Sequence, residues 1–266
     1  MTMRTWIDIN SHYFSSDPQA TAHYRGLLAD KSLERLVLCS VDLQLDPSPD
    51  FPFMSCFASS NEQLWKFAQS LDSPKIIPWC HIDPLAADAV AQLETWVKRG
   101  MRGVKMYPPR GFHVDDARAL RIYHAANAMN VPVFLHMGRT AAHPQLDSTF
   151  GQPLRLERVG LACPALRLFI GHFAAPWSRE AMHLALGFPN FYFELSTSGA
   201  WDLHLLREVI EIEGLGLRRL IFGSNGVGAN NLRAARELES KLRAHNFNEA
   251  EIDAIFHGNA AACLSL

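Results

Sequence analysis

Imidazole groups recur at one kind of place in this sequence, the carboxyl end of a short apolar run. The clearest cases are His12, His136 and His172. A neutral imidazole can accept a proton near neutral pH and can also bind a metal ion. A single histidine at such a position is more often structural or solvated. Three of them at equivalent run ends favour one shared site, so we expect these side chains to act as acid, base or metal ligands.

The first apolar run carries two further polar residues ahead of its histidine, Asp8 and Asn10. Side chains alternate along a strand, which predicts that Asp8, Asn10 and His12 point the same way. An inward aspartate beneath a histidine is suited to holding an imidazole or a lysine in position. The alternative is a buried structural aspartate that only satisfies hydrogen bonds.

Lys105 lies in the fourth run, within GVKMYPP. It could hold a substrate carboxylate, polarise a carbonyl group or carry carbonate as a modified ligand. The alternative is an ion pair with Asp8.

Other side chains at these run ends are suited to binding substrate. Arg139 follows His136 closely, and Tyr107 and Arg110 follow Lys105. An arginine in such a loop can bind a carboxylate through two parallel hydrogen bonds, whereas a plain surface arginine is the other reading. We also expect His81 and Asn10 to line the site and to contact substrate.

Eight apolar, β-rich runs alternate with amphipathic segments. Parallel strands covered on both faces have this composition. The runs are Trp6–Asn10, Arg35–Ser40, Ile76–His81, Gly103–Tyr107, Val131–Met137, Leu166–His172, Phe191–Ser196 and Leu220–Asn225. The clearest helical segments are Asn61–Leu71, Ala86–Arg99, Asp115–Met129, Ala229–Ala244 and Asn248–Leu264. This order predicts an α/β fold, a (β/α)8 TIM barrel forming one domain over residues 1–266, with a doubly wound open sheet as the alternative. In a barrel, the carboxyl ends of all strands meet around one pocket.

Composition narrows the partners and the location. The formal net charge is −2, and no basic face is evident, which argues against nucleic acid as a partner. The first ten residues lack a signal-peptide pattern, and no apolar run is long enough for a membrane span. Five cysteines stand singly, with no Cys-x-x-Cys pair, which predicts a reduced cytoplasmic protein. Cys39 and Cys80 lie inside apolar runs and are expected in the core.

The loop between Asp46 and Asn61 is rich in proline, serine and aromatic residues. It follows the second run, on the face where barrel active sites lie. Phe51, Phe53 and Phe57 could form a lid over substrate, or the segment could be a packed surface loop.

Several segments in this order resemble the amidohydrolase superfamily, in the branch that contains decarboxylases and lactonases. They are WIDINSHYF, VPVFLHMG, LRLFIGHFAAPW, RLIFGSNGVG and the closing IDAIFHGNAAACL. In that family the first strand reads Asp-x-His-x-His, strands five and six each contribute a histidine, and strand eight ends with an aspartate. The resemblance implies a divalent metal such as Zn²⁺ at these positions.

Two ligand positions depart from the family pattern. Asn10 stands where the family has the first histidine of its pair, and Asn225 stands where it has the strand-eight aspartate that activates water. A carboxamide is a poor zinc ligand and cannot accept a proton at neutral pH. His12, His136 and His172 could still bind Zn²⁺ if they converge, but the site is degenerate.

The resemblance implies a hydrolase that acts on a small lactone, amide or ester carrying a carboxylate, with weakly bound metal or none. His172 or His136 would serve as general acid or base, Asp8, Lys105 and Asn225 would assist, and Arg139 would bind the substrate anion. A decarboxylase-type lyase is the nearest chemical alternative. A pseudoenzyme that binds a metabolite without turnover is the third reading. Family members are often dimers, so a homodimer is expected.

Overall fold

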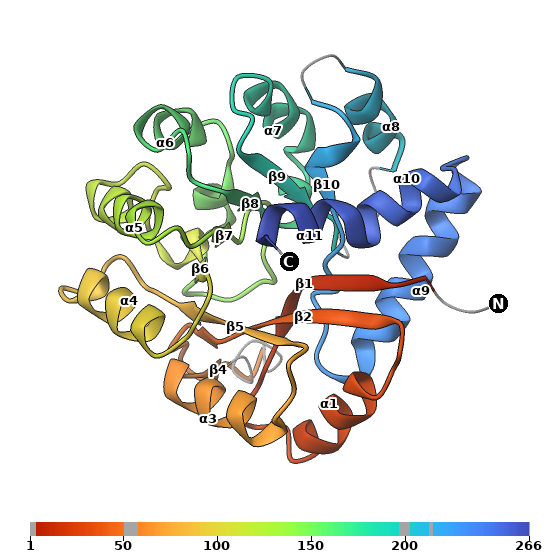
Figure 1. Cartoon of the computed structure of the whole chain (residues 1–266). Helices are drawn as coiled ribbons and strands as arrows, with labels where there is room; N and C mark the ends of the chain where they lie inside the picture. Colours follow the sequence, from red (N-terminus) through yellow and green to blue (C-terminus); the bar gives the residue numbers. More distant parts are fainter. Residues whose placement is uncertain (1–3, 51–57, 197–202, 213–214, 266) are drawn as a thin grey trace.

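Eight parallel strands follow one another around a barrel in chain order (Figure 1). The computed structural model describes residues 4–50, 58–196, 203–212 and 215–265. The strands are β1 (Trp6–His12), β2 (Leu33–Cys39), β5 (Ile76–His81), β6 (Val104–Met106), β7 (Val133–Leu135), β8 (Leu168–Ile170), β9 (Phe191–Glu194) and β10 (Leu220–Ile221). A parallel bridge between Ser11 and Gly226 brings the first strand against the chain that follows the last. This consecutive order confirms the barrel and excludes the doubly wound sheet.

Helices surround the strands on the outside of the barrel, except for the last helix, which lies across one end (Figure 1). They are α1 (Ala20–Leu28), α3 (Asn61–Leu71), α4 (Ala89–Lys98), α5 (Ala117–Ala128), α6 (Leu156–Ala162), α7 (Ser178–Ala185), α8 (Leu203–Glu211), α9 (Ala229–Ala244), α10 (Glu249–Asp253) and α11 (Asn259–Leu264). The five segments predicted as helices all contain helix. The predicted closing segment is interrupted by a π-helical turn, Ala254–Gly258, between α10 and α11.

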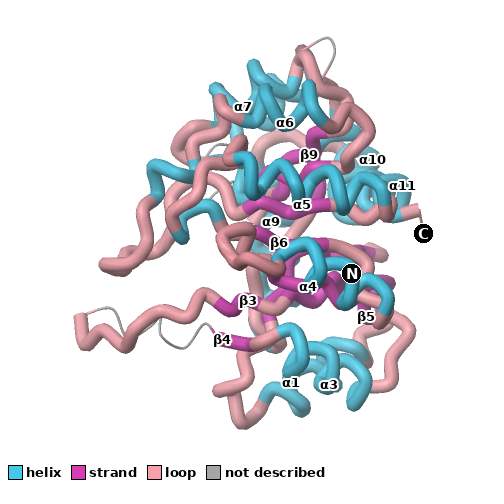
Figure 2. The backbone as a smooth tube through the Cα atoms, turned by 90° about the vertical axis from the view of Figure 1, so that its left-hand side faces the viewer, coloured by secondary structure: helices cyan, strands magenta, loops and turns pink. Residues whose placement is uncertain are grey.

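The interior of the barrel is filled by large apolar side chains that alternate with the outward-facing ones. Ile7, Trp79, Phe134 and Phe169 belong to this inner cluster, and Cys263 of α11 packs against it from one end. The short antiparallel pair of β3 (Val41–Asp42) and β4 (Ala58–Ser59) lies at the opposite end (Figure 2). The apolar layer and α11 therefore close one mouth, and the carboxyl ends of the strands form the other.

The first strand does not keep the strict alternation that the sequence predicts. Its pairing with β2 shifts register between Asp8 and Ser11, which marks a bulge. Asn10 lies inside the barrel mouth beside Lys105, while Asp8 contacts Asn231 of α9. The prediction that Asp8, Asn10 and His12 point the same way was therefore wrong for Asp8, because the extra residue of the bulge reverses the alternation.

Cys39 and Cys80 are fully buried in the core, as predicted. Cys56 and the predicted lid residues Phe51, Phe53 and Phe57 lie outside the described residues. Within the described ranges, no helix combines the length and the apolar character that crossing a membrane would require.

Candidate active site

A chain of four hydrogen-bonded side chains crosses the mouth of the barrel, from Glu194 through Ser196 and His172 to His136. The Ser196 hydroxyl donates to Glu194 Oε2 over 3.2 Å and also contacts His172 Nδ1. His172 Nε2 lies 2.9 Å from His136 Nδ1. All four side chains are buried. The structure thus brings His136 and His172 into direct contact, and we call these four residues the proton chain.

With Glu194 ionised, the hydrogen bonds specify which ring nitrogen carries each proton. Burial holds the pKa of His136 well below its usual value, and burial together with Lys105 lowers the pKa of His172 to about 3. Both rings are therefore neutral near pH 7, with one N–H and one lone pair each. Because Ser196 donates to the Glu194 carboxylate, its oxygen accepts from His172 Nδ1, and His172 Nε2 then accepts from His136 Nδ1. The lone pair left at the end of the proton chain is on His136 Nε2.

His136 Nε2 is also buried without a hydrogen-bond partner among the described residues. A buried polar atom without a partner is unusual, and such atoms are most often found where a ligand or a reaction needs them. The proton chain therefore ends in an imidazole lone pair that is available to a bound molecule.

Lys105 lies beside the proton chain in a pocket of donors and aromatic surface. Its ammonium group lies 2.7 Å from Asn10 Oδ1, 2.5 Å from His12 Nε2 and 4.6 Å from the centre of the Phe134 ring. The side chain is 1 % exposed, and burial lowers its pKa. We call Lys105 and these three neighbours the lysine cluster. The alternative that Lys105 pairs directly with Asp8 was wrong.

Asn10 joins the lysine cluster to the proton chain. Its oxygen accepts from Lys105, and its Nδ2 donates to Glu194 Oε1 over 3.2 Å. A carboxamide has one acceptor end and one donor end, so it can lie between an ammonium group and a carboxylate and satisfy both. The sequence suggested that Asn10 replaces a metal ligand and contacts substrate, whereas in the structure it links Lys105 to Glu194.

Glu194 is the functional residue that the sequence analysis missed. It is the one acidic residue in the run FYFELS, and its side chain is fully buried. Burial is the main cause that raises its pKa to about 7, against the lowering effect of the His172 N–H, Asn10 and Lys105. The sequence signal that could have identified it is a single carboxylate inside an apolar strand, at a position whose side chain faces the barrel interior.

Glycines make room for these side chains. A Cβ on Gly223 would lie 2.1 Å from Glu194 Oε1, and a Cβ on Gly171 would lie 2.7 Å from the carbonyl oxygen of Leu135. His172 itself has a φ of 55°, and the two residues after it are also left-handed. This turn directs His172 into the mouth instead of along the strand.

Two aromatic groups hold the imidazoles from the sides. The ring of Tyr107 stacks on His136 with 4.1 Å between centroids, and its hydroxyl contacts Thr140. The ring of Phe14 stacks on His12 with 6.1 Å between centroids. Tyr107 was predicted to bind substrate, and its position favours a role in orienting His136.

The predicted wall residues are spread around the rim of the mouth. His81 is buried, and its backbone N–H donates to Asn61 Oδ1 and to Ser40. Burial is the main cause that lowers the pKa of His81 to about 4. The charges of Lys105 and Arg110 lower this pKa further, and the charge of Asp83 raises it. Arg110 is half-buried and Arg139 is exposed. Both arginines are thus at the surface, outside the buried proton chain.

Two residues predicted to be catalytic lie outside the cluster. The Asp8 carboxylate accepts from the backbone N–H groups of Asn10 and Ser224 and from the Asn231 side chain. It ties β1 to the chain after β10 and contacts neither an imidazole nor the lysine, so its place is structural. Asn225 is exposed with a φ of 51°. It lies in the turn between β10 and α9, next to Gly226, whose carbonyl oxygen accepts from the His12 backbone N–H.

The donor arrangement does not fit the predicted metal ion. Among the described residues, no group of three or more His, Cys, Asp or Glu side chains is placed to hold one. His12 Nε2 faces the Lys105 ammonium, and His136 and His172 face each other. A divalent ion 4 Å from a lysine ammonium would be repelled by about 8 kcal/mol at an effective dielectric of about 20. The expectation that His12, His136 and His172 share one metal was therefore wrong for this geometry.

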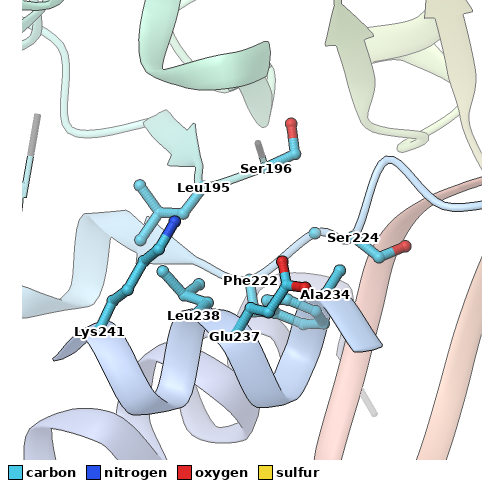
Figure 3. A pocket seen from close by; sticks show the side chains of 9 residues that line it. Leu195, Ser196, Phe222, Ser224, Ala234, Glu237, Leu238 and Lys241 are labelled. Atoms are coloured by element: carbon cyan, nitrogen blue, oxygen red, sulfur yellow. The ribbon is translucent and has the colours of Figure 1, made fainter. Parts of the chain in front are cut away.

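A small pocket of about 50 Å³ lies between β9, β10 and α9. Leu195 and Ser196 line it on one side, and Glu237 and Lys241 of α9 line it on the other. Figure 3 shows the Ser196 hydroxyl pointing away from Lys241. Substrate pockets are usually several times larger, so this space lies behind the proton chain and is not the place for a substrate.

Solved structures with the same fold cover nearly the whole chain. An uncharacterised TIM-barrel protein of Bordetella bronchiseptica has a TM-score of 0.71 at 20 % identity and covers 98 % of both chains. A 5-carboxyvanillate decarboxylase of Novosphingobium aromaticivorans, complexed with manganese, has a TM-score of 0.68 at 13 % identity over 100 % of this chain and 97 % of that one. A probable 2-pyrone-4,6-dicarboxylic acid hydrolase of Acinetobacter baumannii has a TM-score of 0.66 at 13 % identity over 98 % and 100 %.

A search of curated proteins gave no match. The family model described as Amidohydrolase matches residues 49–266, which is most of the chain and includes the strands that carry Lys105, His136, His172 and Glu194. The protein therefore belongs to the amidohydrolase family.

Proposed function

We propose that this protein hydrolyses a small lactone or ester that carries a carboxylate, and that it does so with side chains and without a resident metal. The observation that carries the proposal is the proton chain, which ends in the unpartnered lone pair of His136 Nε2 next to a buried ammonium group. Hydrolysis of a carbonyl compound needs a base for water and a positive group for the oxyanion.

His136 is the general base in this proposal. Its Nε2 accepts a proton from water as the water oxygen attacks the carbonyl carbon. The imidazolium that forms on His136 is stabilised through His172 and Ser196 by the Glu194 carboxylate. The same proton then passes from His136 to the leaving alkoxide oxygen when the C–O bond breaks, which restores the neutral base.

Lys105 stabilises the negative charge that develops on the carbonyl oxygen. Asn10 Oδ1 and His12 Nε2 account for two of its three N–H donors, which leaves one for the oxyanion. Lys105 is buried, so its charge interacts more strongly with an oxyanion here than it would in water.

Arg110 and Arg139 bind the carboxylate of the substrate at the rim. Both carry a permanent positive charge, and both follow strands that contribute to the site, β6 and β7. Lactones and activated esters open more readily than amides, which suits a site that relies on a neutral imidazole. A cytoplasmic location and a homodimeric assembly stay predictions.

A substrate screen tests the proposal. Purified enzyme is incubated with carboxylate-bearing lactones, aryl esters and matched compounds that lack the carboxylate, and acid release is followed with a pH indicator. We expect hydrolysis of a carboxylate-bearing compound, with kcat reduced about 10²-fold or more in His136→Gln. Arg139→Gln should instead raise KM.

Other results would refute the hydrolase proposal. Release of CO₂ from aromatic carboxylates, with no ring opening or ester cleavage, would establish the lyase alternative. Binding of a metabolite with no turnover of any compound would establish the pseudoenzyme alternative.

A further inference from the structure

The lysine cluster has the composition of a cation-binding site. A carbonyl oxygen from Asn10, a ring nitrogen from His12 and the face of Phe134 all point at the Lys105 ammonium group. Each of these groups is an established partner of a positive charge. All are buried, so these contacts to the cation are shielded from bulk solvent.

A negative group lies directly behind these contacts. Glu194 Oε1 accepts from the Nδ2 of Asn10, the residue whose oxygen accepts from Lys105. The amide of Asn10 therefore transmits the charge of the carboxylate to the cation through two hydrogen bonds. A neutral side chain in place of Lys105 would leave Glu194, Asn10 and His12 arranged around no positive charge.

We propose that the Lys105 ammonium is a built-in cation that takes the place of a divalent metal, and that its pocket accepts a small primary ammonium ion once the lysine is shortened. The inference depends on the contacts of Lys105 alone and holds whatever substrate the enzyme uses. It follows that the wild-type protein should not retain divalent metal at this site, because a second cation would meet the ammonium.

Two variants separate the charge of Lys105 from its volume. Lys105→Met removes the charge and keeps a side chain of similar length. Lys105→Ala removes both and leaves a space among Asn10, His12 and Phe134. Thermal midpoints are measured for both variants and the wild type with and without propylammonium chloride, with sodium chloride at equal ionic strength as the control. Manganese and zinc contents are measured after loading and desalting.

We expect propylammonium to raise the thermal midpoint of Lys105→Ala by about 5–10 °C at saturation and to leave the other two proteins unchanged. We also expect the wild type to retain only substoichiometric manganese or zinc. Failure of Lys105→Ala to respond to propylammonium would overturn the inference, as would an equal response of all three proteins.

The metal content of the wild type gives a test that needs no variant to fold. One equivalent of manganese or zinc retained by the wild-type protein, with Lys105 in place, would contradict the inference. Loss of all enzymatic activity in the substrate screen would refute the proposed function and leave this inference standing, because neither measurement uses a substrate.

Discussion

Gly223→Ala should disable the site by displacing Glu194. The new Cβ would lie 2.1 Å from Glu194 Oε1 and 2.8 Å from the next two atoms of that side chain. Van der Waals contact requires more than 3 Å, so the carboxylate must move by about 1 Å. Such a movement breaks or lengthens its bonds to Asn10, to Ser196 and to the His172 backbone N–H.

The cost follows from the number of bonds lost. A buried hydrogen bond to a charged group contributes about 1.5–3 kcal/mol. Losing one to two of them, less the gain of about 0.4–1 kcal/mol from the stiffer unfolded chain, gives a net destabilisation of about 0.5–5.5 kcal/mol. Because Glu194 orients the proton chain, kcat should also fall about 10²-fold or more.

Gly26→Ala is the matched control. Gly26 lies in α1, and its Cβ would have nothing within 4 Å. The substitution should therefore stabilise the protein by about 0.5–1 kcal/mol and leave the rate unchanged. Urea unfolding and substrate turnover are measured for both variants. A Gly223→Ala protein with wild-type stability and rate would refute the reasoning, since Glu194 would then not pack against Gly223.

Three further outcomes are expected. The rate should fall as the pH drops through about 7 in the wild type, because a protonated Glu194 no longer supplies the negative charge that stabilises the His136 imidazolium. A Glu194→Gln variant should be slow, with no such step in its pH–rate profile. Tyr107→Phe should keep most of the activity, whereas the rate of Tyr107→Leu should fall about 10-fold, because the ring of Tyr107 stacks on His136. Equal rates of the two variants in a turnover assay would contradict this role. Asp8→Asn should destabilise the fold by about 1–3 kcal/mol in urea unfolding while the folded enzyme keeps its KM, because the carboxylate accepts three hydrogen bonds outside the mouth.

The order of strands was predictable because the signal is repeated along the whole chain. Each apolar run is short and β-rich, and each is followed by an amphipathic segment, so errors of a few residues at the ends do not alter the fold. The carboxyl-end position of His12, Lys105, His136 and His172 follows from the same pattern. The structure places these four side chains in one mouth.

The orientation of side chains was harder to predict, because it depends on local backbone irregularities. The bulge in β1 turns Asp8 toward α9 while Asn10 stays in the mouth. His172 reaches the site only through a left-handed turn after Gly171. Neither feature has a sequence signal as strong as the alternation rule that it breaks.

The role of Asn10 could not be predicted without its partners. From the sequence, the residue differs from a family ligand, and the loss of a metal site is the natural reading. Its value becomes clear only when Lys105 and Glu194 are found on its two ends. Glu194 lies on β9, far from Asn10 in the sequence, and nothing in FYFELS connects the two.

In the proposed mechanism, protein side chains and not a resident metal supply the base and the positive charge. The rate of hydrolysis of the screened substrate after exhaustive treatment with a chelator tests this directly. We predict an unchanged rate compared with untreated enzyme, and no increase when manganese or zinc is added back. A chelated enzyme that loses its activity, and regains it with either metal, would contradict the account.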